Sequence, residues 1–257
     1  MHGIIIRKTR VRENDLVINW LTQDDLMIAA YAGHIHHSHA YPNGLELMTV
    51  YEIELGSRPH AMASLKSAYH VEQFDNLIVD VAANACACAA LEAVSDICPE
   101  NSIIIDLFQT MLQVFAVMHT APEYAPLVLA WFEVFVIHQM GSLHNLDMCA
   151  QCAGPLAQSA WYREEMGFFC KRCVPDVQNV PPFLLEALRR LKNQSLRQTL
   201  QNAVAQNRPD QMVRVVAPVI RFLAATIAET AQTKKLHAHR YMADVVLGMP
   251  NLLDCSP

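Results

Sequence analysis

The segment "MCAQCAGPLAQSAWYREEMGFFCKRCVP", from Met148 to Pro175, contains two Cys-x-x-Cys pairs separated by seventeen residues. Each Cys-x-x-Cys turn can direct two thiolates at one ion, and two such turns complete a tetrahedral site. Because sulfur occupies all four positions, no position remains for water or substrate. The spacing therefore predicts a structural zinc ion, about one per chain, with the ligands Cys149, Cys152, Cys170 and Cys173.

Other interpretations of these thiols are open. Two disulfides are disfavoured in a reducing compartment, and unrelated thiols are disfavoured by the repeated spacing. An iron–sulfur cluster uses the same ligands. His70-x-Glu72 with the first Cys pair imitates a zinc deaminase, but Met148 stands where that signature has proline, and the second pair would compete for the metal. We assign no chemistry to the other cysteines, Cys86, Cys88, Cys98 and Cys255.

The first eighty residues precede this segment and have the pattern of short strands. Five runs are rich in β-branched, aromatic and aliphatic residues, and turn-forming residues separate them. Five strands without intervening helices predict a small β-barrel or sandwich. The runs are 4–11, 15–22, 26–33, 45–56 and 61–71.

Helical periodicity begins after about Asn76, with apolar residues at three- and four-residue spacing. Pro218 lies inside the last apolar pattern and is expected to kink or divide that helix. We therefore predict an α+β protein with a β domain at 1–78 and a helical domain at 79–257, which carries the zinc module at about 145–178. The expected helices are 77–98, 102–119, 125–140, 181–193 and 209–230.

The apolar runs are those of a protein without a membrane anchor. The run 125–140 is interrupted by Glu133 and His138 and is shorter than the roughly 20 residues that cross a bilayer, so we expect a buried core helix. The N-terminus has only three consecutive isoleucines, too few for a secretory signal. The expected location is cytoplasmic.

Charge is distributed unevenly along the chain, whose net charge is −6. Residues 1–80 have a balance of −4, residues 81–148 of −7, and residues 149–257 of +5. An anionic partner should therefore prefer the C-terminal part.

The basic residues are the candidate contacts for phosphates or for an acidic peptide. Those of the C-terminal part are Arg163, Lys171, Arg172, Arg189, Arg190, Lys192 and Arg197. In the β domain, strand alternation would place Lys8, Arg10 and Arg12 on one face. Arg7, Arg58 and Lys66 are further candidates there. Both groups are equally consistent with ordinary solvated charges.

The sequence does not indicate an enzyme. It contains no Walker loop, Gly-x-Gly-x-x-Gly, Gly-x-Ser-x-Gly or His-Glu-x-x-His motif, and eight glycines leave little material for a phosphate-binding loop. The run "GHIHHSH" has four histidines between His34 and His39. These could bind a transition metal or become charged below their ordinary pKa of roughly 6.5, or they could be incidental residues of a solvated loop.

The order of these parts resembles the bacterial recombination mediator family RecO along nearly the whole chain. The matching stretches are "GIIIRKTRVRENDLVINWLT", "WFEVFVIHQMGSLHNLDMCAQCAG" and a weakened C-terminal "KKLHAHRYM". The resemblance implies an N-terminal OB-fold, a helical domain and a zinc-finger module. It also implies a non-enzymatic protein that binds and anneals single- and double-stranded DNA. The implied partners are RecR and the tail of the single-stranded-DNA-binding protein, and together they help to load recombinase.

The chain departs from the family pattern after the third strand, where the family is rich in Arg and Lys. Here the residues are histidines, in a domain of net charge −4. Because Lys and Arg dominate non-specific affinity for DNA, an alternative function is an adaptor of the same fold that has weak or lost DNA binding. Its basic helices would then bind acidic protein tails.

Overall fold

A computed structural model describes residues 1–35, 39–42, 44–56, 62–156, 160–173, 179–206, 209–233 and 235–248. The chain divides into two compact units, Met1–Ala125 and Pro126–Pro257. Strands give way to helices between Gln73 and Asn76, inside the first unit. The domain boundary at 78/79 stays a prediction.

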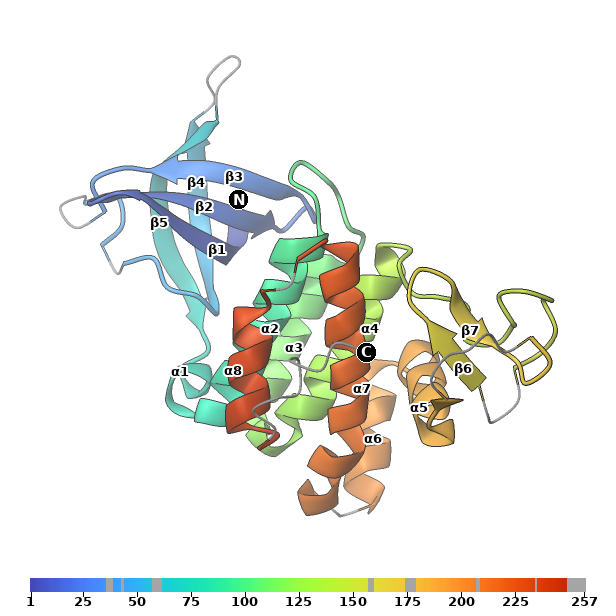
Figure 1. Ribbon diagram of the computed structural model, residues 1–257. Helices are drawn as coiled ribbons and strands as arrows, with labels where there is room; N and C mark the ends of the chain where they lie inside the picture. Colours follow the sequence, from blue (N-terminus) through green and yellow to red (C-terminus); the bar gives the residue numbers. More distant parts are fainter. Residues whose placement is uncertain are drawn as a thin grey trace. The chain divides into compact units, whose positions relative to one another are not determined.

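The first unit contains a closed five-stranded barrel with the order β1-β2-β3-β5-β4 (Figure 1). β1 pairs with β4 to close it, β3 and β5 are parallel, and the other pairs are antiparallel. This confirms the predicted OB-fold. The strands are β1 His2–Arg12, β2 Asp15–Thr22, β3 Met27–Ala32, β4 Thr49–Gly56 and β5 Ala63–Gln73.

Aromatic and β-branched side chains fill the barrel interior. Trp20 and Tyr51 meet edge to face, with ring centroids 5.6 Å apart, and both are fully buried. Ile5 and Ile18 pack in the same cluster. Alternation along the strands places these residues inward, which is why the runs of the sequence predicted half-buried strands.

Helices complete the first unit, and two of them differ from the expected ranges. The helix expected at 77–98 is divided at Asp80, because the Asp80 carboxylate accepts a hydrogen bond from Ala83 N at 2.8 Å and so caps a new helix. The helix expected from residue 102 begins only at Leu107. The elements are α1 Asn76–Val79, α2 Val81–Ile97, α3 Leu107–Thr120 and η1 Pro122–Tyr124.

Residues 102–104 are not helical because they pair with the start of β3, and Ile105 lies in the turn that leads into α3. Met27 N donates to Ser102 O at 3.0 Å, and Ile104 N donates to Asp25 O at 3.2 Å. Leu26 and Ile103 form an isolated antiparallel bridge. Ile103 and Ile104 therefore extend the barrel sheet by one bridge instead of starting α3.

The second unit consists of helices and a small three-stranded sheet of order β7-β6-β8. Helix α7 coincides with the expected range and continues through Pro218, so this proline does not divide the helix; the alternative expectation of a kink stays a prediction. Helices α6 and α8 were not predicted. The elements are α4 Ala125–Gln139, β6 Ala160–Arg163, β7 Gly167–Phe169, β8 Asn179–Val180, α5 Pro182–Asn193, α6 Leu196–Gln206, α7 Pro209–Thr230 and α8 His237–Val245.

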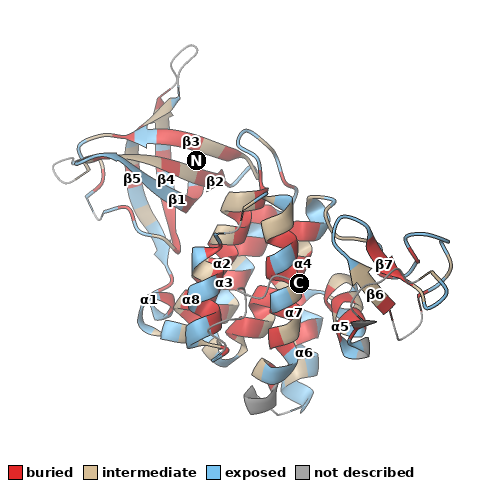
Figure 2. Ribbon diagram, in the orientation of Figure 1, coloured by how far each residue is buried: buried red, intermediate tan, exposed pale blue. Residues whose placement is uncertain are grey.

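Buried residues lie on the inward faces of the helices, and exposed residues lie on their outer faces and in the loops (Figure 2). Among the described residues, no single helix is long and apolar enough to cross a membrane; α3 and the following η1–α4 segment pass that test only jointly, as a bent pair, on length and composition.

Candidate metal centre and cationic surface

The four predicted ligands lie together in the second unit. One sulfur from each of Cys149, Cys152, Cys170 and Cys173 lies within 4.8 Å of every other. The sulfurs of Cys152 and Cys170 are 3.8 Å apart. Such a set of four sulfurs can hold a metal ion, and thiolate sulfur is the donor that zinc uses in closed structural sites.

Two turns and a hairpin bring the sulfurs together. Cys149 N donates to Gly154 O at 2.8 Å, and Ala153 N donates to Cys149 O at 3.0 Å, which closes the first turn. Ala150 N donates to Phe168 O at 2.8 Å and so ties this turn to β7. The second turn closes when Cys173 N donates to Cys170 O at 3.0 Å.

The backbone of these turns favours thiolates. Burial raises the pKa of Cys149, but backbone N–H groups of Cys152, Cys170 and Gln151 donate to its sulfur and lower the pKa to about 6. The N–H of Arg172 lowers the pKa of Cys170. Because metals bind the thiolate, these N–H groups prepare the cluster for a cation.

Cys173 behaves in the opposite way. A hydrogen bond with the Cys152 sulfur and, secondly, burial raise the pKa of Cys173 to about 12. Close sulfurs without a cation between them share protons, because adjacent negative charges repel. A metal ion at the centre removes this penalty and displaces the remaining protons.

An aromatic cluster attaches the β6–β7 hairpin to α7. Tyr162 and Phe222 meet at 4.8 Å between ring centroids, and Phe168 lies 5.7 Å from Phe222. The hairpin turn adds a polar contact, because Glu165 N donates to Glu229 Oε1 at 2.7 Å. The metal centre is therefore carried by a hairpin that packs on the longest helix of the unit.

Arg189 of α5 contacts the backbone on both sides of the first Cys turn. Its guanidinium donates to Leu146 O at 2.7 Å and to Leu156 O at 3.2 Å, and it pairs with Asp147 at 3.0 Å. These groups flank the first Cys turn. Arg189 thus acts as a structural support, with few donors left for a ligand.

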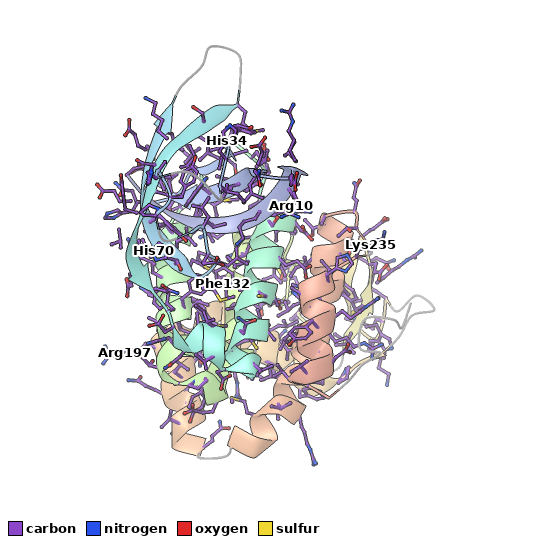
Figure 3. The ribbon with its side chains drawn as sticks, turned by 90° about the vertical axis from the view of Figure 1, so that its left-hand side faces the viewer. Arg10, His34, His70, Phe132, Arg197 and Lys235 are labelled. Atoms are coloured by element: carbon purple, nitrogen blue, oxygen red, sulfur yellow. The ribbon has the colours of Figure 1, made fainter. Side chains whose placement is uncertain are left out.

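The other predicted cations of this unit are more accessible. Arg190 pairs with Glu186 at 2.9 Å on the surface of α5. Five of the predicted cations have no ion-pair partner within the described residues: Arg163 on β6, Lys171 and Arg172 between the last two cysteines, Lys192 on α5 and Arg197 on α6. Arg197 lies on the outside of the helices, whereas Phe132 lies among them (Figure 3).

Two of the three residues of the predicted basic stripe on β1 lie on the same face of the strand. Lys8 pairs with Ile18 in the register and Arg10 with Leu16, so these two share a face. A bulge between Arg10 and Arg12 places Arg12 opposite Asp15, on the other face, because a one-residue shift reverses side-chain direction. The expectation that all three share a face is therefore wrong.

Lys8 is also engaged within the barrel. Its Nζ donates to Leu45 O at 2.7 Å and lies 3.5 Å from a carboxylate oxygen of Glu46. Arg10 and Arg12 are exposed. Arg58 and residues 36–38 of the histidine run lie outside the described residues. His34 is exposed, and its N–H donates to Asp15 Oδ1 at 3.1 Å.

A buried pair in the second unit was not predicted. His239 Nε2 of α8 and Glu133 Oε1 of α4 lie 2.7 Å apart, and neither side chain is exposed. The available signal was a glutamate inside an otherwise apolar helix, which requires a polar partner. The sequence could not name that partner, because it lies 106 positions away.

Known proteins are similar to this chain in sequence. A family model described as "Recombination protein O C terminal" matches residues 79–221. The DNA repair protein RecO of Anaeromyxobacter dehalogenans (strain 2CP-C) is 27% identical over 201 residues, which cover 76% of this chain and 79% of that protein.

A second relative comes from a different bacterium. DNA repair protein RecO of Dehalococcoides mccartyi (strain ATCC BAA-2266 / KCTC 15142 / 195) is 26% identical over 182 residues, or 70% of this chain and 71% of that protein. The family match covers more than half of the chain, and the barrel, the helices and the clustered cysteines agree with the resemblance in the sequence. On these grounds the chain belongs to the RecO family of DNA repair and recombination proteins.

Proposed function

We propose that this protein is a non-enzymatic cytoplasmic recombination mediator that binds and anneals single- and double-stranded DNA. It would help to load recombinase on single strands together with a RecR-like mediator and the tail of the single-stranded-DNA-binding protein. The observation that supports DNA contact is that five of the predicted cations are exposed or half-exposed and lack an ion-pair partner within the described residues, and that two of them, Lys171 and Arg172, lie inside the four-cysteine module. We call Arg163, Lys171, Arg172, Lys192 and Arg197 the cationic surface.

Zinc has a structural role in this proposal. Cys149, Cys152, Cys170 and Cys173 would hold the ion and fix the turn that carries Lys171 and Arg172. Metal analysis of purified protein should find about one zinc per chain. Cys170→Ser should lose the zinc, whereas Cys88→Ser, in helix α2, should keep it. Protein that is folded and free of metal would contradict this assignment.

Fluorescence anisotropy with a single-stranded oligonucleotide across a salt series tests the DNA-binding role. The logarithm of affinity should fall with the logarithm of salt, with a slope of about −0.7 for each phosphate contacted. Lys171→Glu/Arg172→Glu should weaken binding while zinc stays bound.

The matched control is Arg214→Glu/Lys235→Glu, which changes net charge equally at two exposed positions outside the cationic surface. Equal loss of affinity in both double variants would show that only net charge matters, and unchanged affinity in the first would overturn the proposal.

The charge of the first unit supports a second candidate, a protein-interaction adaptor with weak DNA binding. Residues 1–125 contain 6 Lys/Arg against 15 Asp/Glu, a net charge of −9. Such a unit repels DNA, so the basic helices of the second unit would bind acidic protein tails instead. A pull-down with an acidic tail peptide tests this function. DNA binding without peptide binding would discard it.

A further inference from the structure

The connection between α2 and α3 forms a short, exposed sheet edge in the first unit. It continues the sheet beside the turn between β2 and β3 (Figure 1). Ile103 is bridged to Leu26 through hydrogen bonds of its neighbours, so its own N–H and C=O point away from β3. Within the described part of the chain, neither Ile103 N–H nor Ile105 N–H has a hydrogen-bond partner. We call residues 102–105 the outer edge.

The outer edge is held in place before any partner arrives. Asn101 N donates to Met27 O at 2.7 Å, and the Asp25 carboxylate accepts from Asp106 N and Phe108 N at 2.8 Å each. These contacts fix both ends of the segment. Because the segment is already ordered, binding of a strand here costs little conformational entropy on the side of this protein.

Apolar side chains on the outer edge face solvent. Ile103 is 68% exposed and Ile105 is 69% exposed, whereas Ile104 between them is 6% exposed and packs inward. Natural sheet edges are usually protected by charged side chains, proline or a covering element. This edge instead combines unpaired backbone groups with two exposed isoleucines, the combination used when a protein accepts an added strand.

The charges around the outer edge select the kind of strand. Asp24, Glu100 and Asp106 are exposed acidic residues in or beside the two connections that form it. The sequence has no Lys or Arg at 13–57 or at 67–162, which includes β2, β3 and all helices of this unit. Phosphates are repelled by such a surface and cationic side chains are attracted to it.

We propose that the outer edge docks an extended segment of a protein partner in which Lys or Arg alternates with apolar residues. The segment would pair with the backbone of Ile103, cover the side chains of Ile103 and Ile105, and place its cations near Asp24, Glu100 and Asp106. This site is separate from the cationic surface and does not depend on DNA binding.

The probe is a short fluorescein-labelled peptide that alternates Lys and Val, added to the full-length protein at low salt. It should bind, and hydrogen exchange at the amides of Ile103 and Ile105 should slow. Ile103→Lys/Ile105→Lys should weaken binding by about tenfold or more, because two apolar contacts are lost and two like charges are added.

The matched control is Ile78→Lys/Val79→Lys, which places the same charges on two exposed apolar residues of α1. It should leave binding unchanged, and thermal unfolding checks that both double variants fold. Equal weakening in the two variants, or equal binding of a peptide with Glu in place of Lys, would overturn the proposal. So would protection of these amides by a single-stranded oligonucleotide or by self-association of the protein.

Discussion

At the scale of single residues, the Asp15 carboxylate shows how the barrel stabilises a charge near its rim. The Tyr31 hydroxyl donates to it and lowers its pKa, and His34 N–H contributes a second hydrogen bond at 3.1 Å. A carboxylate with a lower pKa in the folded state stabilises the fold above its ordinary pKa. That contribution is lost as the pH falls through the folded-state value.

We therefore predict that Tyr31→Phe raises the pKa of Asp15 toward its ordinary value, because the strongest hydrogen bond to the carboxylate is removed. The measurement is an NMR titration of the Asp15 carboxyl carbon. Tyr69→Phe, at an exposed tyrosine of β5, should leave that titration unchanged. An unaltered pKa in Tyr31→Phe would show that the His34 amide is sufficient.

The buried pair of Glu133 and His239 leads to a prediction about stability. Removing one partner leaves the other polar group in an apolar interior, so His239→Ala should reduce the free energy of unfolding by about 3 kcal/mol. His237→Ala, at an exposed position of the same helix, should have little effect. Urea denaturation measures both values.

A double variant separates the lost interaction from lost packing. Glu133→Leu with His239→Leu removes both members of the pair and should recover part of the stability, because neither is left without the other in the apolar interior. If the double variant is less stable than His239→Ala, side-chain packing and not the polar interaction determines the contribution of this pair to stability.

At the scale of secondary structure, helix α3 is capped by a residue of another element. Its own N-cap residue, Asp106, makes no side-chain cap. The Asp25 carboxylate, from the turn before β3, accepts instead from Asp106 N and Phe108 N at 2.8 Å each. One side chain thus joins the barrel to the start of α3.

Asp25→Ala should therefore destabilise the first unit by about 1 kcal/mol or more, in the range of a lost N-cap. Hydrogen exchange should accelerate most at the first turn of α3 and at the amide of Ile104. Asp24→Ala, at the neighbouring exposed aspartate, provides the comparison and should change neither. Uniform acceleration across the unit would contradict a local cap.

The same contacts explain which elements the sequence could predict. The range 15–22 for β2 and the range 209–230 for α7 agree with the structure, because local periodicity determines them. The four cysteines were predictable for the same reason, since their spacing is local. Residues 102–105 were assigned to a helix because their partner, Asp25, lies far away in sequence. Helices α6 and α8 are short, with 11 and 9 residues, and were missed.

At the scale of the whole molecule, opposite charges are placed in different units. The first unit has a net charge of −9 and the second, with 13 Lys/Arg against 10 Asp/Glu, has +3. Electrostatics at this scale determine which partners approach each unit. Two sets of ligands of opposite charge are therefore compatible with one chain, with phosphates at the cationic surface and a basic segment at the outer edge.

Salt dependence can distinguish cations that contact DNA from cations that hold the fold. Lys171→Gln/Arg172→Gln should make the slope of log affinity against log salt less steep by about 1.4 for single strands, because two phosphate contacts are lost. Arg189→Gln should leave the slope unchanged, since that guanidinium is engaged with Leu146 O, Leu156 O and Asp147. It should instead lower the thermal stability of the cysteine module. If the slope became less steep by the same amount in both variants, Arg189 would be a DNA contact. The metal alone would then have to support the first Cys turn.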